Sequence, residues 1–121
     1  MVLDGHRVLL IEDDFLIQMD LAETLQGQGA EVTVAASVHD GLIHAEAEFD
    51  AAVLDIRLPD GEVFPVAEKL VERDTPVIFH SGNVDSSTVA QRFPNSIALS
   101  KPVHERRLIE AVRQTVAKRR T

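Results

Sequence analysis

Carboxylates, a hydroxyl group and an amine follow the apolar segments of this sequence, at the points where strands would end. They are Glu12 and Asp13 after the first segment, Asp55 at the end of the third, Ser81 after the fourth and Lys101 after the fifth. Carboxylates that are held close together repel one another unless a cation lies between them. Mg²⁺ uses one or two carboxylates and completes its octahedral shell with waters and phosphate oxygens. The pattern therefore predicts a Mg²⁺ site that handles a phosphoryl group.

Asp55 is the candidate nucleophile, because it ends the most apolar segment and a turn at residues 58–61 follows it closely. A carboxylate can form an aspartyl phosphate when a metal ion and a fixed ammonium group neutralise the transferring phosphoryl oxygens. Lys101 would supply the ammonium group. Ser81 and the backbone N–H groups near Gly82 would donate hydrogen bonds to the phosphoryl oxygens.

Each of these residues also has an ordinary structural interpretation when it is considered alone. Asp14, at the start of a helix, is expected to be an N-cap that also compensates the helix dipole. Asp55 could be a turn former, Ser81 precedes residues that are typical of a turn, and Lys101 could be a surface lysine. The functional interpretation depends on their joint occurrence at the ends of successive strands.

The elements that must position these residues alternate along the chain. Segments with a helical period of about 3.6 separate five short apolar segments, at residues 7–12, 30–35, 51–55, 76–80 and 96–99. The first, third and fourth segments are almost continuously apolar, as buried central strands should be. The alternation predicts an α/β fold with a doubly wound parallel sheet, which binds ligands beyond the carboxyl ends of its strands.

Capping residues and local pattern predict how the helices begin and end. Ser37 is expected to cap the second helix, and Gly27 is expected to end the first. The last helix is expected over residues 105–118, with basic residues at its end, where the helix dipole favours them. Residues 84–93 have a poor helical pattern with three consecutive hydroxyl residues, which predicts a short or mobile fourth helix.

Composition limits the class of protein. The chain has 121 residues, of which 45% are hydrophobic and 26% charged, and this fits one folded domain over residues 1–121. The formal net charge of −8 disfavours direct contact with nucleic acid or with anionic membranes. The absence of cysteine excludes disulfides and thiolate chemistry, and the first residues lack the apolar core of a signal peptide. A cytoplasmic protein is expected.

The motifs, taken in order, resemble the receiver domain of bacterial response regulators. The matching stretches are VLLIEDD at residues 8–14, VLDIRLPDG at 53–61, VIFHSG at 77–82 and SKPV at 100–103, and the resemblance covers essentially the whole chain. It implies a flavodoxin-like, five-stranded parallel sheet in the order 2-1-3-4-5. It also implies a switch that accepts a phosphoryl group on Asp55 from a histidine kinase or a histidine phosphotransfer protein. A downstream protein partner would then read this switch.

The resemblance assigns metal-binding roles to four residues. Glu12 and Asp13 correspond to the acidic pair of the family, in which Asp13 would bind Mg²⁺ directly and Glu12 through water. Asp55 corresponds to the phospho-acceptor, which is also a metal ligand. The backbone carbonyl of Arg57 would be a further ligand.

The resemblance also assigns phosphoryl-binding roles to two residues. Ser81 stands where the family has its switch hydroxyl, and Lys101 matches the phosphoryl-binding lysine, whose bond to Pro102 is cis in the family.

This chain departs from the family pattern at two positions. The family often has an aromatic residue three positions before the lysine, where this chain has Ala98, and Phe after Lys-Pro, where this chain has Val103. These changes predict a different readout, for example by ordering of the fourth helix.

Several alternatives stay open at this point. Arg57 and Asn83 flank the approach of an attacking water, and we expect them to tune hydrolysis of the phosphoryl group. The chain would promote its own phosphorylation and dephosphorylation without turning over external substrates. A phosphatase of the haloacid-dehalogenase type is disfavoured, because its general acid would stand at Arg57. A receiver-like binding module, a stand-alone regulator and a piece of a longer protein are further possibilities.

Overall fold

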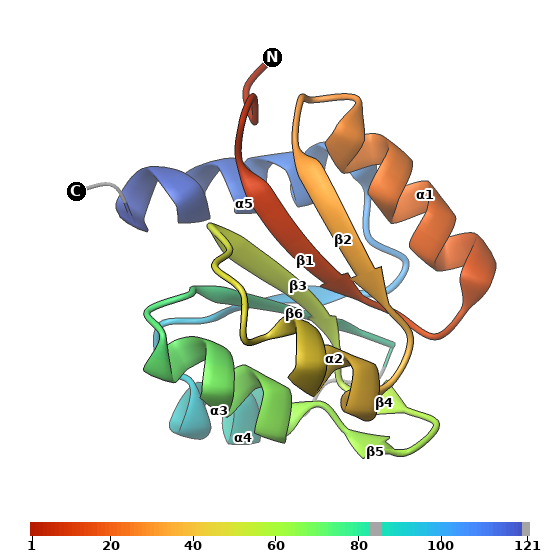
Figure 1. Cartoon of the computed structure of the whole chain (residues 1–121), viewed down its shortest axis with the longest axis vertical. Coiled ribbons are helices and arrows are strands. Elements are labelled where there is room, and N and C mark those ends of the chain that lie inside the picture. The colour runs from red at the N-terminus through yellow and green to blue at the C-terminus, as the bar shows by residue number, and fades with distance from the viewer. Residues whose placement is uncertain (83–85, 120–121) are drawn as a thin grey trace.

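A parallel sheet of five strands forms the centre of the molecule (Figure 1). The structure is a computed structural model that describes residues 1–82 and 86–119. In chain order, the strands are β1 (Arg7–Ile11), β2 (Glu31–Ala35), β3 (Ala51–Asp55), β6 (Val77–Ser81) and β7 (Ile97–Ser100). They lie side by side as β2-β1-β3-β6-β7, and neighbouring strands are parallel. This is the order 2-1-3-4-5 of the five expected strands, so the predicted fold is confirmed.

Helices cover both faces of the sheet (Figure 1). On one face lie α1 (Phe15–Gln26) and α5 (Glu105–Arg119), and on the other lie α2 (Val38–His44), α3 (Phe64–Glu72) and α4 (Ser86–Arg92). A hairpin of two short strands, β4 (Arg57–Leu58) and β5 (Gly61–Glu62), connects β3 to α3. The sequence predicted only a turn at this position, and the hairpin is an additional element.

Each face of the sheet has its own apolar core, because successive side chains of a strand point to opposite faces. Along β1, Val8 and Leu10 pack with α1 and α5, whereas Leu9 and Ile11 pack with α2 and α3. All five residues of β3 and of β6 are buried. This burial agrees with the central position predicted for these strands.

The helix boundaries follow local capping. The Asp14 carboxylate accepts hydrogen bonds from the backbone N–H groups of Leu16 and Ile17 at 3.0 and 3.1 Å, so Asp14 is the N-cap of α1. Ser37 caps α2, and α1 ends before Gly27. The fourth helix has seven residues and is short, as predicted. Residues 84 and 85, where the expected segment began, lie outside the described residues.

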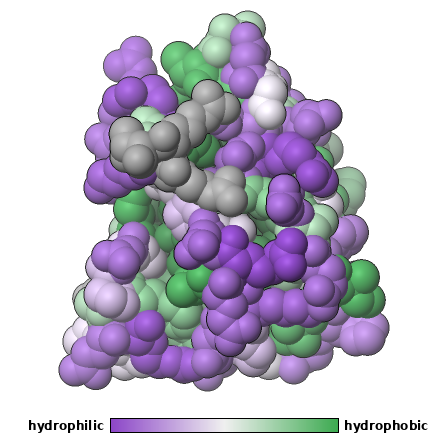
Figure 2. Space-filling model, turned by 60° about the vertical axis from the view of Figure 1, so that its left-hand side comes forward, coloured by the Kyte–Doolittle hydropathy of each residue, from purple (hydrophilic) through white to green (hydrophobic). Residues whose placement is uncertain are grey.

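Polar side chains cover most of the face shown in Figure 2, and apolar residues form separate, smaller areas among them. Several of the exposed large apolar residues belong to the first helix. They include Phe15, Leu16, Ile17 and Met19 of α1. Within residues 1–82 and 86–119, no helix combines the length and the apolar character that crossing a membrane requires.

Candidate functional site

Carboxylates from two neighbouring strands meet at the carboxyl edge of the sheet. Glu12 and Asp13 directly follow β1, and Asp55 is the last residue of β3, which pairs with β1. One carboxylate oxygen from each residue lies within 4.8 Å of the other two. Glu12 and Asp55 are buried, and Asp13 is exposed. The sheet therefore brings together three of the residues that the sequence singled out.

Lys101 contacts two of these three carboxylates. Its Nζ donates hydrogen bonds to Oε1 of Glu12 at 2.7 Å and to Oδ2 of Asp55 at 3.1 Å. Lys101 follows β7, and its backbone N–H donates to the carbonyl oxygen of Ser81 at 3.0 Å. Burial lowers the pKa of Lys101, but the hydrogen bonds with Glu12 and Asp55 outweigh this effect and raise the pKa overall. The ammonium group is therefore a fixed positive charge at neutral pH.

Glu12 carries the strongest electrostatic perturbation of the cluster. Burial raises the pKa of Glu12 to about 7, with a further contribution from its hydrogen bond to Asp55, although Lys101 acts in the opposite direction. A divalent cation among the three carboxylates would favour the ionised form of Glu12. Hard carboxylate oxygens are the donors that Mg²⁺ prefers, so the residues present fit this ion.

Ser81, Gly82 and Arg57, three further predicted site residues that the structure describes, lie at the same edge of the sheet. Asp55 pairs in register with His80 of β6, so Ser81 lies one residue further along the edge. Ser81 is buried, Gly82 is exposed, and Arg57 is exposed at the start of β4. Their roles stay predictions.

Three further expectations concern the surroundings of the site. The peptide bond between Lys101 and Pro102 is cis, as the resemblance implies. Ala98 is exposed on β7, in the position where the family often has an aromatic ring. Asn83 lies outside the described residues, so its tuning role also stays a prediction.

His80 is a buried neighbour of the site that sequence reasoning did not single out. It is fully buried, and neither ring nitrogen has a hydrogen-bond partner among the residues that the structure describes. Burial, with a smaller contribution from the charge of Lys101, lowers the pKa of His80 to about 4. The ring is therefore neutral at pH 7. The available signal was a histidine within an otherwise apolar strand, directly before the hydroxyl residue Ser81.

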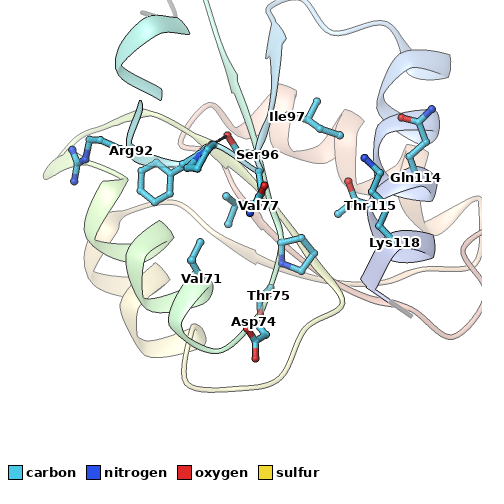
Figure 3. A pocket seen from close by; sticks show the side chains of 14 residues that line it. Val71, Asp74, Thr75, Val77, Arg92, Ser96, Ile97, Gln114, Thr115 and Lys118 are labelled. Atoms are coloured by element: carbon cyan, nitrogen blue, oxygen red, sulfur yellow. Dashed lines mark hydrogen bonds between the residues drawn. The ribbon is translucent and has the colours of Figure 1, made fainter. Parts of the chain in front are cut away.

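Two cavities lie at opposite edges of the sheet. A cavity of about 390 Å³ lies beside the carboxylate cluster. It is lined by Leu16, Ile17, Asp20, Leu21, His80, Lys101, Pro102 and Val103. A larger cavity of about 670 Å³ lies among the starts of β6 and β7 and the ends of α4 and α5 (Figure 3). None of the predicted site residues that the structure describes lines the larger cavity.

The sheet order and the cluster of carboxylates and lysine at its carboxyl edge define a receiver-type signalling domain. Residues 8–113 match the family model described as response regulator receiver domain. The chain belongs to this family. Its members act in two-component signalling systems, and acceptance of a phosphoryl group is their general function.

Relatives agree with this assignment. The sensor protein TorS of Escherichia coli is 32% identical over 94 residues, which are 74% of this chain and 10% of TorS. A CheY-like receiver domain from Methanospirillum hungatei is 28% identical, with a TM-score of 0.85 over 98% of this chain and 97% of that chain. The receiver domain of a sensor histidine kinase from Pseudomonas aeruginosa, solved with magnesium in its active site cleft, is 22% identical. Its TM-score is 0.80, over 93% of this chain and 98% of that chain.

The curated relatives are longer than this chain. The chain spans 10%, 26% and 44% of the length of three that it matches, namely TorS, DctD of Rhizobium meliloti and YvcP of Bacillus subtilis. The similarity therefore concerns the receiver domain.

Proposed function

We propose that residues 1–121 form a single receiver domain that takes a phosphoryl group onto Asp55 in a Mg²⁺-dependent reaction. The protein would act as a phosphorylation-controlled signalling switch in the cytoplasm. The observation that carries this proposal is the contact of Lys101 Nζ with both Asp55 and Glu12, at 3.1 and 2.7 Å. A candidate nucleophile, a candidate cation-binding cluster and a fixed positive charge thus lie together.

The proposed reaction moves a phosphoryl group between two side chains. A carboxylate oxygen of Asp55 forms a P–O bond while the P–N bond of a donor phosphohistidine breaks. The donor imidazole nitrogen keeps the electron pair of the broken bond and takes up a proton. Mg²⁺, when bound, neutralises negative charge on the transferring oxygens. Lys101 supplies a second positive charge from its position beside Asp55.

The other site residues receive the roles that the family pattern implies. Ser81 and the backbone N–H of Gly82 would donate hydrogen bonds to the phosphoryl oxygens, and the Arg57 carbonyl would complete the metal shell. Arg57 and Asn83 would adjust the access of water to the phosphoryl group. The solved Pseudomonas aeruginosa receiver supports Mg²⁺ as the cofactor, because it has the same fold and holds magnesium in its active site cleft.

The donor would be a histidine kinase or a histidine phosphotransfer protein. Its histidine has to reach Asp55, and α1 begins at Phe15, after the acidic pair and the N-cap Asp14. Phe15, Leu16 and Met19 of α1 are 69%, 70% and 42% exposed. Exposed apolar residues that lie close together are typical of a surface that docks a protein. We therefore include α1 in the donor-binding surface and assign the output to a separate protein partner, with no direct contact to nucleic acid or membrane.

An NMR comparison tests the proposal. Beryllofluoride with Mg²⁺ imitates an acyl phosphate, and it should shift the amide signals of Arg57, Ser81 and residues 86–92 in the wild-type protein. Asp55→Asn should show no such shifts, because it lacks the carboxylate oxygen that bonds to the analogue. Asp40→Asn, a change in an exposed residue of α2, should respond like the wild type. A wild-type protein that does not respond would instead be a binding module without phosphoryl chemistry.

A further inference from the structure

The hairpin of β4 and β5, which follows β3, carries a carboxylate that contacts α2. Asp60 lies in the turn between β4 and β5. Its Oδ1 accepts a hydrogen bond from the backbone N–H of Val38 at 2.8 Å, and its Oδ2 accepts one from His39 at 3.0 Å. A bond from the N–H of Val63 to the carbonyl oxygen of Ile56, at 2.8 Å, closes the base of the hairpin. Asp60 therefore joins the segment that follows Asp55 to the start of α2. Figure 1 shows the hairpin of β4 and β5 beside α2.

The start of α2 has a second, local cap. Ser37 is the N-cap residue, and its hydroxyl oxygen accepts a hydrogen bond from the backbone N–H of Asp40 at 3.1 Å. The first N–H groups of a helix have no partner inside the helix, and a negative charge is favourable there. The hydrogen bonds from Val38 and His39 hold the pKa of Asp60 below its usual range, so the carboxylate stays ionised. Ser37, directly before α2, thus provides one cap, and Asp60 of the β4–β5 hairpin provides the other.

The helix α2 is in turn fixed to the strand that carries the acidic pair. A Cβ atom at Gly41 would lie 2.7 Å from Cδ1 of Ile11 and 3.2 Å from Cγ2 of Val66, so α2 packs closely against β1 and α3 at this glycine. The backbone N–H of Glu12 also donates to the carbonyl oxygen of Ala35 at 3.0 Å, shortly before α2 begins. The start of α2 is therefore held in a defined position relative to Glu12.

We propose that Asp60 is a positioning residue for the metal site. Its contact with α2 holds the hairpin, and with it the backbone carbonyl of Arg57, at a set distance from the acidic pair that follows β1. This inference rests on the proposed function, because the Arg57 carbonyl is a ligand only if the site binds Mg²⁺. Residues that orient metal ligands without touching the metal commonly change its affinity by 10- to 100-fold.

A pair of matched variants tests this role. Asp60→Ala and Ser37→Ala each remove one cap from α2, but only Asp60→Ala releases the hairpin. The chain has no Trp or Tyr, so Mg²⁺ titrations are followed by the amide signals of Asp13 and Arg57. We expect Asp60→Ala to weaken Mg²⁺ binding roughly tenfold and Ser37→Ala to leave it unchanged. The first amides of α2 should exchange hydrogen faster in both variants, whereas the Arg57 amide should do so only in Asp60→Ala.

Asp60→Asn provides a second measurement that disturbs folding less. Its side chain keeps one acceptor oxygen, so its Mg²⁺ affinity should lie between those of the wild type and Asp60→Ala. Wild-type affinity in both Asp60 variants, or an equal loss in Ser37→Ala, would overturn the positioning role while leaving the metal site in place. A wild-type protein that binds no Mg²⁺ would overturn the proposed metal site and this inference together.

Discussion

Nζ of Lys101 lies 2.7 Å from Oε1 of Glu12, across 89 positions of the chain, and Glu12 is fully buried. This contact places a permanent positive charge against a carboxylate whose pKa is raised to about 7 by burial. The charge of the cluster therefore changes within the neutral pH range. Binding of a cation, protonation of Glu12 and stability of the fold are consequently linked.

Mg²⁺ affinity should weaken as the pH falls below about 7. Protonated Glu12 has to lose its proton before it can serve as an anionic partner of the cation, because burial raises its pKa to about 7. Each pH unit below that value should weaken the apparent affinity roughly tenfold. NMR titrations with Mg²⁺ on both sides of neutrality measure this slope. Glu12→Gln should bind more weakly with no slope in this range, and a flat wild-type profile would refute the linkage.

Lys101→Met should destabilise the protein more at high pH than at low pH. Glu12 would stay buried without its ammonium partner, and loss of one partner of a buried ion pair costs about 3–5 kcal/mol. The folded-state pKa of Glu12, already above its ordinary 4.5, would rise further. A folded state that binds more protons than the unfolded state loses stability as the pH rises.

Urea unfolding of Lys101→Met on either side of neutrality measures this difference. Lys69→Met is the matched control, because Lys69 pairs with the exposed Glu46. Exposed ion pairs contribute little to stability. An equal loss of stability at both pH values in Lys101→Met would contradict the assigned role of Glu12.

His80→Leu should stabilise the protein at neutral pH by roughly 1 kcal/mol, because an apolar side chain removes two buried ring nitrogens without partners. The advantage should grow in acid. The pKa of His80 is lowered from 6.5 to about 4, so between these values the unfolded ring binds a proton that the folded ring does not. The wild type therefore loses stability as the pH falls through this range, by roughly 3 kcal/mol in total.

Urea unfolding at pH 7 and in mild acid measures both effects of His80→Leu. Val89→Ala is a useful contrast, because it changes a buried apolar residue of α4 without changing any titrating group. It should destabilise the protein by a similar amount at both pH values. A lower stability of His80→Leu at pH 7 would show that the imidazole has a stabilising partner.

The sheet and the convergence of the carboxylates were predictable from sequence, because both depend on local patterns. Continuous apolar segments indicate buried parallel strands, and the carboxyl ends of such strands share one edge, so Asp55 and Glu12 were expected to lie close together. Asp14 and Ser37 were equally predictable, since an N-cap acts on amides two or three residues away.

Other features depend on contacts that sequence spacing does not reveal. Asp60 looked like a turn residue, and its bonds to α2 span 21 and 22 positions of the chain. The two-residue strands β4 and β5 are too short to show a period of alternation. The isolation of the His80 ring is a property of the packing around it, which the residue type alone does not specify.

Phosphorylation of Asp55 is tested by the intact mass of the protein after incubation with acetyl phosphate and Mg²⁺. The wild-type protein should gain the mass of one phosphoryl group, and the gain should disappear when Mg²⁺ is removed with a chelator. Asp55→Asn should gain nothing under the same conditions. An equal gain in Asp55→Asn, or none in the wild-type protein, would contradict the assignment of Asp55 as the acceptor.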